Sequence, residues 1–315
     1  MAGRKAERRP RVAVIGGAVL DRKYRARREF ILETSNPVDG YRTFGGVARN
    51  VAENLLRLGV SVRFVSIVGD DESGHSLVGH LRSLGADVSR VDFAGGRRTA
   101  EYVAVLDPRN ELLIGLADMA VLDLLTPEWL ETAWPAIGEA DWIFADCNPP
   151  AETLVSLIGR AKASDIRLAI NTVSSPKAMR LPNDLSGVDL IFTNLVEAGA
   201  MLGRAGEMTA SEAAAGLHEA GAAQVIVTQG AKGYAVAGAE GVVSAGAVPA
   251  HPVDITGAGD AFAAGTLYRI LAGETVLQAA RSGALLAALT TESEMSVHPG
   301  LSPGLLQRAA DRMLT

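Results

Sequence analysis

Residues 254–265 read DITGAGDAFAAG, a glycine-rich turn that leads directly into a run of small, apolar residues typical of a helix. Gly257, Ala258 and Gly259 carry little or no side chain, so the backbone N–H groups at the start of that helix stay uncovered. Free N–H groups and the positive end of the helix dipole together favour bound anions. The segment therefore predicts an anion-binding turn at the amino terminus of a helix.

Asp260 is the last residue of the same turn. A carboxylate there would repel a bound phosphate unless it had a task of its own, and accepting a proton from an attacking hydroxyl group is such a task. In the simpler alternative, Asp260 only caps the helix by accepting hydrogen bonds from nearby amides. The complete pattern, Asp-x-Thr-Gly-Ala-Gly-Asp before a small-residue helix, favours the catalytic interpretation.

Strand-like and helix-like segments alternate along most of the chain. Such alternation predicts a mostly parallel sheet with helices on both faces, and ligands bound beyond the carboxyl ends of the strands. We expect one α/β domain over residues 11–315. The expected strands are 11–17, 62–68, 142–145, 168–171, 190–193 and 224–228, and the expected helices are 47–58, 74–84, 152–162, 197–202 and 211–220.

Two further segments, about Tyr24–Thr34 and Thr99–Leu106, have a different pattern. The second reads TAEYVAVL and roughly alternates in polarity, which is typical of a strand with one face open to solvent. We expect both to belong to a small sheet that projects from the main body, with lid segments at about 20–44 and 97–117.

The composition is that of an ordinary globular chain. Of its 315 residues 48% are hydrophobic and 21% are charged, and its net charge is −6. A mildly acidic protein lacks the basic field that a general nucleic-acid binder needs. Its one cysteine, Cys147, leaves no internal disulfide and fits a reducing compartment.

The amino terminus is locally basic, and we expect residues 1–10 to form a disordered, solvated tail. The segment lacks the apolar centre of a signal peptide. No apolar run approaches the ~20 residues needed to span a bilayer. These features predict a soluble, cytoplasmic protein without a membrane partner.

A second glycine motif, GGVARN at Gly45–Asn50, precedes one of the expected helices. Taken alone, two glycines before a helix usually form a tight turn. Together with DITGAGD, however, they make the chain resemble the ribokinase-like (PfkB) family of carbohydrate and nucleoside kinases. The resemblance is close, although Ile255 stands where the family commonly has threonine.

The resemblance implies an ATP-dependent phosphotransferase of ribokinase-like fold. Gly257, Ala258 and Gly259 would form the anion hole and Asp260 would be the catalytic base. Further residues would contact the acceptor or cover it: Asp21 after the first strand, Gly45, Gly46, Asn50, and Thr99 in the lid. The alternative for Asp21 is an ordinary surface-loop aspartate.

The resemblance also extends to the nucleotide side. TNLVE contains an NxxE motif, Asn194 to Glu197, whose glutamate would help hold Mg²⁺ largely through water. The two residues could equally form a helix cap. The remaining ATP-binding residues would be Thr256 and a TxGxxG segment comprising Thr228, Gly230 and Gly233, which could otherwise be a hairpin turn.

Two other family properties are implied. The family often binds a monovalent cation such as K⁺ beside the anion hole, for which Asp254 and Ser293 are the candidates here. Lid sheets of related kinases can pair, so the projecting strands could form a homodimer by edge pairing. Lys177 is either a charge near the phosphate or a solvated lysine.

Several stretches resemble the pseudouridine kinase branch of the family in particular. They are TSNP at 34–37, GGVARNVAENLLRLG at 45–59 and LTTESE at 289–294, although Val19 stands where that branch usually has asparagine. The resemblance implies phosphorylation of the 5′-hydroxyl of pseudouridine, with Ser35 and Asn36 as polar contacts.

Two alternatives remain. The acceptor could be ribose, a fructose-type sugar or a purine nucleoside, or the chain could be a non-catalytic regulator that binds a nucleotide or sugar. The retention of Asp260, the glycines and Glu197 argues against the regulator. A Rossmann-type dehydrogenase is excluded because IGGAVLD lacks the GxGxxG spacing that wraps a pyrophosphate.

Overall fold

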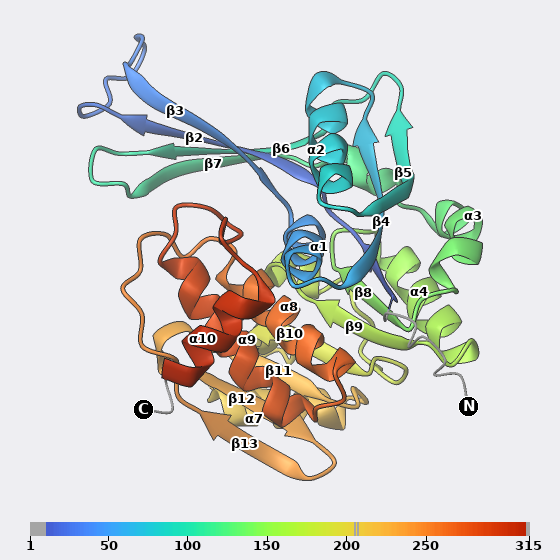
Figure 1. The fold of residues 1–315 in the computed structure, drawn as a ribbon. Coiled ribbons are helices and arrows are strands. Elements are labelled where there is room, and N and C mark those ends of the chain that lie inside the picture. The colour runs from blue at the N-terminus through green and yellow to red at the C-terminus, as the bar shows by residue number, and fades with distance from the viewer. Residues whose placement is uncertain (1–10, 205, 207, 313–315) are drawn as a thin grey trace, which may run out of the picture.

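A computed structural model describes residues 11–204, 206 and 208–312 of the chain (Figure 1). The basic amino-terminal segment, residues 1–10, lies outside this range, so the expectation of a disordered tail stays untested.

The main body is built on a nine-stranded sheet with the order β13-β12-β11-β10-β9-β8-β1-β4-β5. Its pairs are parallel except β11–β12 and β12–β13, so the predicted mostly parallel sheet is confirmed, with an antiparallel hairpin at one edge. The strands are β1 (Arg11–Ile15), β4 (Ser61–Gly69), β5 (Asp87–Ala94), β8 (Trp142–Asp146), β9 (Arg167–Asn171), β10 (Leu190–Asn194), β11 (Val225–Thr228), β12 (Tyr234–Gly238) and β13 (Gly241–Ala245).

Helices cover both faces of this sheet. On one face lie α1 (Val47–Arg57), α2 (Glu72–Ser83), α8 (Ala258–Leu271) and α9 (Val276–Thr291), with α10 (Pro303–Arg312) packed against α9. On the other lie α3 (Pro127–Ile137), α4 (Ala151–Ala163), α5 (Ser175–Ala178), α6 (Leu195–Met201) and α7 (Ala210–Glu219). Two short 3₁₀ helices, η1 (Ala120–Leu124) and η2 (Gly230–Lys232), complete the helices of the described residues.

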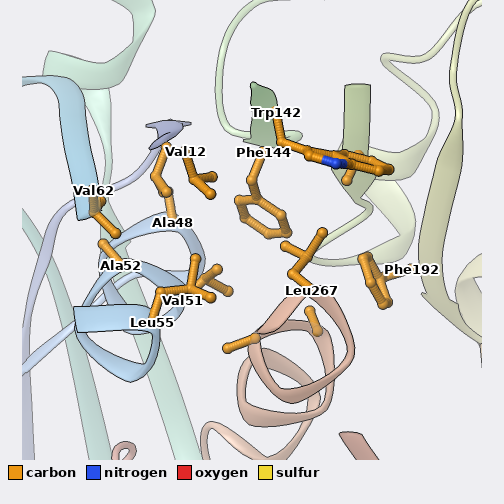
Figure 2. Close-up of a cluster of buried hydrophobic side chains, with 14 of the residues drawn as sticks. Val12, Ala48, Val51, Ala52, Leu55, Val62, Trp142, Phe144, Phe192 and Leu267 are labelled. Carbon is orange, nitrogen blue, oxygen red and sulfur yellow. The ribbon is translucent and has the colours of Figure 1, made fainter. Parts of the chain in front are cut away.

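The alternation of side chains along β1 shows why both faces are covered. Val12 and Val14 belong to the core beneath α1 and α8, whereas Ala13 and Ile15 belong to the core beneath α3 and α4. Successive side chains of a strand point to opposite faces, so a continuous apolar strand needs a layer of helices on each side. Figure 2 shows the first core, in which Leu267 of α8 lies near Phe144 and Phe192.

A second sheet of four strands, in the order β3-β2-β6-β7, projects from the body (Figure 1). It consists of β2 (Val19–Ala26), β3 (Val38–Gly45), β6 (Ala100–Leu106) and β7 (Leu112–Asp118). The pairs β2–β3 and β6–β7 are antiparallel, and β2–β6 is parallel. The predicted small sheet is therefore present.

The first strand of this small sheet differs from the prediction of about 24–34. It begins at Val19, directly after the turn that follows β1, and ends at Ala26, which pairs with Val38. The charged residues after Ala26 belong instead to the connection between β2 and β3, where Glu33 has a positive φ of 60°. A left-handed residue of this kind ends regular strand geometry.

None of the helices in the described ranges is long and apolar enough to cross a membrane.

Candidate functional site

The carboxyl ends of β1 and β8 meet the start of α1 at one buried carboxylate, that of Asp146. Its Oδ2 accepts hydrogen bonds from the backbone N–H groups of Gly17 and Ala48, both at 2.9 Å, and its Oδ1 accepts one from the backbone of Asn148 at 3.0 Å. The side chain is fully buried. Asp146, at the end of β8, therefore ties the turn after β1 and the start of α1 together.

Sequence reasoning missed Asp146. The available signal was its position directly after the apolar strand residues 142–145, at the end where parallel sheets bind ligands. Lys177 lies close to Asp146 as well, and it donates a hydrogen bond to Oδ1 of Asn148. Burial lowers the pKa of Lys177, an effect that the nearby Asp146 opposes.

Asp260 lies in the first turn of α8, beside α1. Its carboxyl group is buried, and its Oδ2 accepts a hydrogen bond of 2.7 Å from Nδ2 of Asn50. Burial raises the pKa of Asp260 to about 7; the hydrogen bond from Asn50 and the charge of Arg49 oppose this rise, and Asp146 and Asp21 add to it. A carboxyl group with a pKa near neutrality is suited to exchange protons at physiological pH.

The turn that precedes Asp260 needs glycine at one position and leaves open space at another. Gly257 is the N-cap of α8 with a left-handed φ of 81°, and a Cβ there would lie 2.1 Å from the carbonyl oxygen of Ser296. A Cβ at Gly259 would meet no atom within 4 Å. Because the first amides of a helix have no partner within it, this open side of the turn can receive an anion.

Asp254 holds the loop that leads into this turn. Its Oδ1 accepts a hydrogen bond of 2.8 Å from the backbone N–H of Thr256, and its Oδ2 pairs with Nζ of Lys23, which β2 carries. Burial alone would raise the pKa of Asp254, but the hydrogen bonds from Lys23 and Thr256 hold it below its ordinary value. The carboxylate is therefore ionised.

The small sheet contributes Asp21, next to the two glycines of the second motif. Burial raises the pKa of Asp21 to about 6, against the lowering effects of Lys23 and Arg49. A Cβ on Gly45 would lie 1.9 Å from Oδ2 of Asp21, and a Cβ on Gly46, whose φ is 94°, would lie 2.4 Å from the carbonyl oxygen of Gly17. Gly45 is thus required for close packing within the small sheet, between β3 and β2, and Gly46 for close packing against the turn that follows β1.

On the nucleotide side, Asn194 and Glu197 form the helix cap that was the structural alternative. Asn194 accepts a hydrogen bond of 2.9 Å from the backbone N–H of Glu197 and donates one of 2.7 Å to its Oε1. Thr172 donates to Oε2 of Glu197. The carboxylate is held at the end of β10, and its oxygens are of the type that Mg²⁺ prefers.

The comparisons with known proteins agree with this arrangement. The family model described as pfkB family carbohydrate kinase matches residues 9–301. The chain belongs to the pfkB family. It is therefore a sugar or nucleoside kinase that uses ATP, and its fold is ribokinase-like.

Three proteins illustrate the relationship of this kinase to others. The uncharacterized sugar kinase YeiI of Escherichia coli (strain K12) is 30% identical over 92% of this chain and 80% of its own. The pseudouridine kinase of the same organism is 28% identical over 92% and 93%. The structure of Arabidopsis thaliana ribokinase complexed with ribose and ATP matches with a TM-score of 0.85 at 21% identity, over 96% of this chain and 98% of that one.

Within the kinase, the TxGxxG segment follows β11. Thr228 donates a hydrogen bond of 3.3 Å to the carbonyl oxygen of Thr193. Gly230 has a φ of 56° and open space where a Cβ would stand, whereas a Cβ on Gly233 would lie 2.0 Å from the carbonyl oxygen of Ala245. Gly230 can therefore face a nucleotide, but Gly233 is required for packing against the edge hairpin.

Thr99 was predicted to contact the acceptor, but its polar atoms are engaged within the protein. Its hydroxyl donates to Oδ1 of Asp71 at 2.6 Å, and its backbone N–H donates to Oδ2 at 2.8 Å. The hydroxyl also accepts from the backbone of Gly69 at 3.1 Å. Thr99 ties the start of β6 to the loop before α2, and its contact with the acceptor stays a prediction.

Ser35 and Asn36, also predicted to contact the acceptor, lie at the far end of the β2–β3 hairpin (Figure 1). The eight residue pairs between Gly45 and Val38 span roughly 25 Å at the usual rise per residue. Asn36 hydrogen-bonds both backbone groups of Ile31, which shapes the turn. An acceptor bound at Asp260 is therefore out of reach of both residues of the same chain.

Sequence reasoning also missed a buried ion pair on α1. Arg49 pairs with Glu53, which is bonded in addition by Arg57 at 2.7 Å and by Nε2 of His80 at 3.0 Å. These side chains line a cavity of about 420 Å³ between the small sheet, α1, α2 and residues 295–299. Leu20 and Arg22 of β2 line this cavity, whereas Asp21 between them points to the other face of the strand. Of the described residues, neither Asp21 nor Asp260 belongs to the lining.

Proposed function

We propose that this kinase phosphorylates the 5′-hydroxyl of pseudouridine to give pseudouridine 5′-phosphate, with Asp260 as the general base. The observation that carries the proposal is a single turn that joins a buried carboxylate to the backbone amides at the amino terminus of α8, with open space beside Gly259. Asp260 stands directly after Gly259, where a side chain would meet no atom within 4 Å. Proton removal and charge stabilisation can therefore act on the same reacting group.

Asp260 would accept the proton of the attacking hydroxyl. The hydrogen bond from Asn50 fixes its Oδ2, so the carboxylate keeps one orientation as the acceptor enters. A primary hydroxyl loses its proton late, as phosphoryl transfer proceeds, and a base with a pKa of about 7 remains largely ionised above neutral pH.

Gly257, Ala258 and Gly259 would hold the transferred phosphoryl group with their amides, and Thr256, Thr228 and Gly230 would lie along the nucleotide. ATP supplies the phosphoryl group, and Mg²⁺ offsets part of its negative charge. Glu197, supported by Asn194, would hold Mg²⁺ through water. Since the described residues contain no group of three or more His, Cys, Asp or Glu side chains able to hold a metal, phosphate and water would complete its coordination.

On the acceptor side, Asp21 would accept hydrogen bonds from hydroxyl groups while the small sheet covers the ligand and excludes water. Gly45 and Gly46 would let the ligand approach the backbone. Support for pseudouridine comes from the resemblance of residues 45–59 and 289–294 to that branch and from the relative at 28% identity. The proposal does not include contacts from Ser35 and Asn36 of the same chain to the acceptor.

A sugar acceptor is the second candidate, because the relative at 30% identity is described as a sugar kinase. Rates of ATP-dependent phosphorylation of pseudouridine, uridine, inosine, ribose and fructose would separate the two. We expect kcat/KM for pseudouridine to exceed that for each other acceptor by at least about tenfold. A preference for another acceptor would overturn the pseudouridine assignment alone, whereas transfer to none of the acceptors would contradict the catalytic proposal as well.

We also propose that the kinase acts in the cytoplasm, where its single, buried Cys147 would stay reduced. Two copies would pair through their small sheets. β7 is an edge strand, and its Leu112, Leu113, Ile114 and Leu116 are each 50% exposed or more. An apolar edge strand open to solvent is a typical surface for association with a second copy.

A further inference from the structure

The resemblance to the family assigns Asp254 and Ser293 to a monovalent cation, but the structure places a protein cation at this carboxylate. Nζ of Lys23 pairs with Oδ2 of Asp254 and lies 3.4 Å from Oγ1 of Thr256. The two charged side chains are 30% and 26% exposed, so the pair is partly shielded from water. Lys23 thus bonds to the carboxylate that a metal cation would need.

The other expected ligands are main-chain oxygens near Thr256 and Ser293, and the side chain of Ser293 has a hydrogen bond of its own. Its hydroxyl accepts a hydrogen bond of 3.1 Å from the backbone N–H of Met295, which closes a turn within its own loop. Lys23 therefore already neutralises the carboxylate that would ligate K⁺, so Asp254 does not fit a bare cation in the arrangement seen here.

The position of the ammonium group explains what it can do. Lys23 lies two residues after Asp21 on the same face of β2, the face turned toward the body. Asp254, its partner, holds the backbone of Thr256, which directly precedes the anion-binding turn. An ionised carboxylate at this point would repel an incoming phosphate, and the charge of Lys23 offsets that repulsion.

We propose that Lys23 is the resident cation of this site and takes the place of K⁺ in the kinase. Because the small sheet carries Lys23, its charge is in place only when that sheet lies against the body as it does here. The inference rests on the kinase activity but not on the identity of the acceptor, and binding of a cation can be measured with no acceptor present.

The wild-type protein provides the first test. At fixed ionic strength, replacing choline chloride by KCl should change kcat by less than about twofold. Crystals soaked in Tl⁺, a heavy mimic of K⁺, should show no anomalous peak at Asp254. A strong requirement for K⁺, or Tl⁺ bound to Asp254, would overturn the proposal. The Tl⁺ result holds whether or not pseudouridine is the acceptor.

Lys23→Met, which keeps the length of the side chain and removes its charge, provides the second test. In choline chloride its kcat should fall by at least about tenfold, KCl should restore part of the loss, and Tl⁺ should now bind at Asp254. Arg25→Met, on the same strand two residues away, should behave as wild type. A Lys23→Met protein that is fully active in both salts, or that K⁺ fails to restore, would contradict the proposal; if the variant does not fold, the wild-type measurements decide.

Discussion

At the scale of single residues, the proposed mechanism depends on the unusual environment of Asp260. Burial raises the pKa of its carboxyl group to about 7, while Asn50 and Arg49 limit the rise. The pKa thus lies between the range of an ordinary carboxyl group and that of one held neutral by burial, and the proposed general base needs the ionised form. The pH dependence of the reaction should therefore follow the protonation of Asp260.

We predict that kcat/KM falls as the pH drops below about 7, because the base becomes protonated. In Asn50→Ala the hydrogen bond that lowers the pKa of Asp260 is lost, so the midpoint of this fall should move to higher pH. The exposed Asn183→Ala, in a loop before β10, serves as the control and should keep the wild-type midpoint. An unchanged midpoint in Asn50→Ala would contradict the assignment of the acidic limb to Asp260.

The same pKa also affects stability. The folded-state value of about 7 lies above the ordinary 3.8, so between these values the folded protein binds more protons at Asp260 than the unfolded chain does. The contribution of this group to stability is therefore present at low pH and declines as the pH rises through about 7. Asp21, whose pKa is raised to about 6, acts in the same direction.

At the scale of elements, the turn before α8 contains two glycines with different roles. Gly257→Ala places a Cβ 2.1 Å from a carbonyl oxygen at a φ of 81°, so it should destabilise the fold, by roughly 1–3 kcal/mol. Gly259→Ala meets open space and should keep the wild-type melting temperature but raise KM for ATP, because its methyl group enters the anion site. Thermal unfolding and ATP kinetics of both variants check this contrast; equal destabilisation of the two would contradict it.

The sequence predicted this turn well because all of its determinants lie within seven consecutive residues. Alternation of apolar segments likewise predicted the main sheet. Asp146 was missed because two of its three bonded amides, those of Gly17 and Ala48, come from segments that only the fold brings together. The same holds for Lys23, which is paired with a residue 231 positions away.

The strand boundary that differs from the prediction, and the site residues whose side chains are bonded elsewhere or lie far from Asp260, have local explanations. The prediction placed the first strand of the small sheet at 24–34, whereas β2 is Val19–Ala26. Polarity alone does not distinguish the charged connection after Ala26 from an exposed strand. Thr99 was assigned to the acceptor from its place in the lid, although its partners on Asp71 appear only in three dimensions. Ser35 and Asn36 were assigned from a sequence resemblance that carries no information on distance.

At the scale of the whole molecule, the small sheet would take part in both the proposed catalysis and the proposed dimer. One face delivers Asp21 and Lys23 to the body, while β7 leaves apolar side chains exposed at its outer edge. We predict that the wild-type kinase is a dimer in solution and that the double variant Ile114→Lys, Leu116→Lys is a monomer. Light scattering coupled to gel filtration measures both masses.

Val155→Lys is the matched control for this prediction, since Val155 is 51% exposed on α4 and lies outside the small sheet. It should remain a dimer. A monomeric wild type, or a double variant that still dimerises, would show that the exposed edge of β7 is not the contact between copies.

The most direct test of the central claim is the turnover of Asp260→Asn, measured with the best acceptor at saturating ATP beside the affinity for ATP. The substitution keeps the shape of the side chain and the possibility of a bond to Asn50, but it removes the base. We predict that kcat falls by about 10²–10⁴-fold while the Kd for ATP stays within about threefold of wild type. Turnover close to that of the wild type would contradict the account.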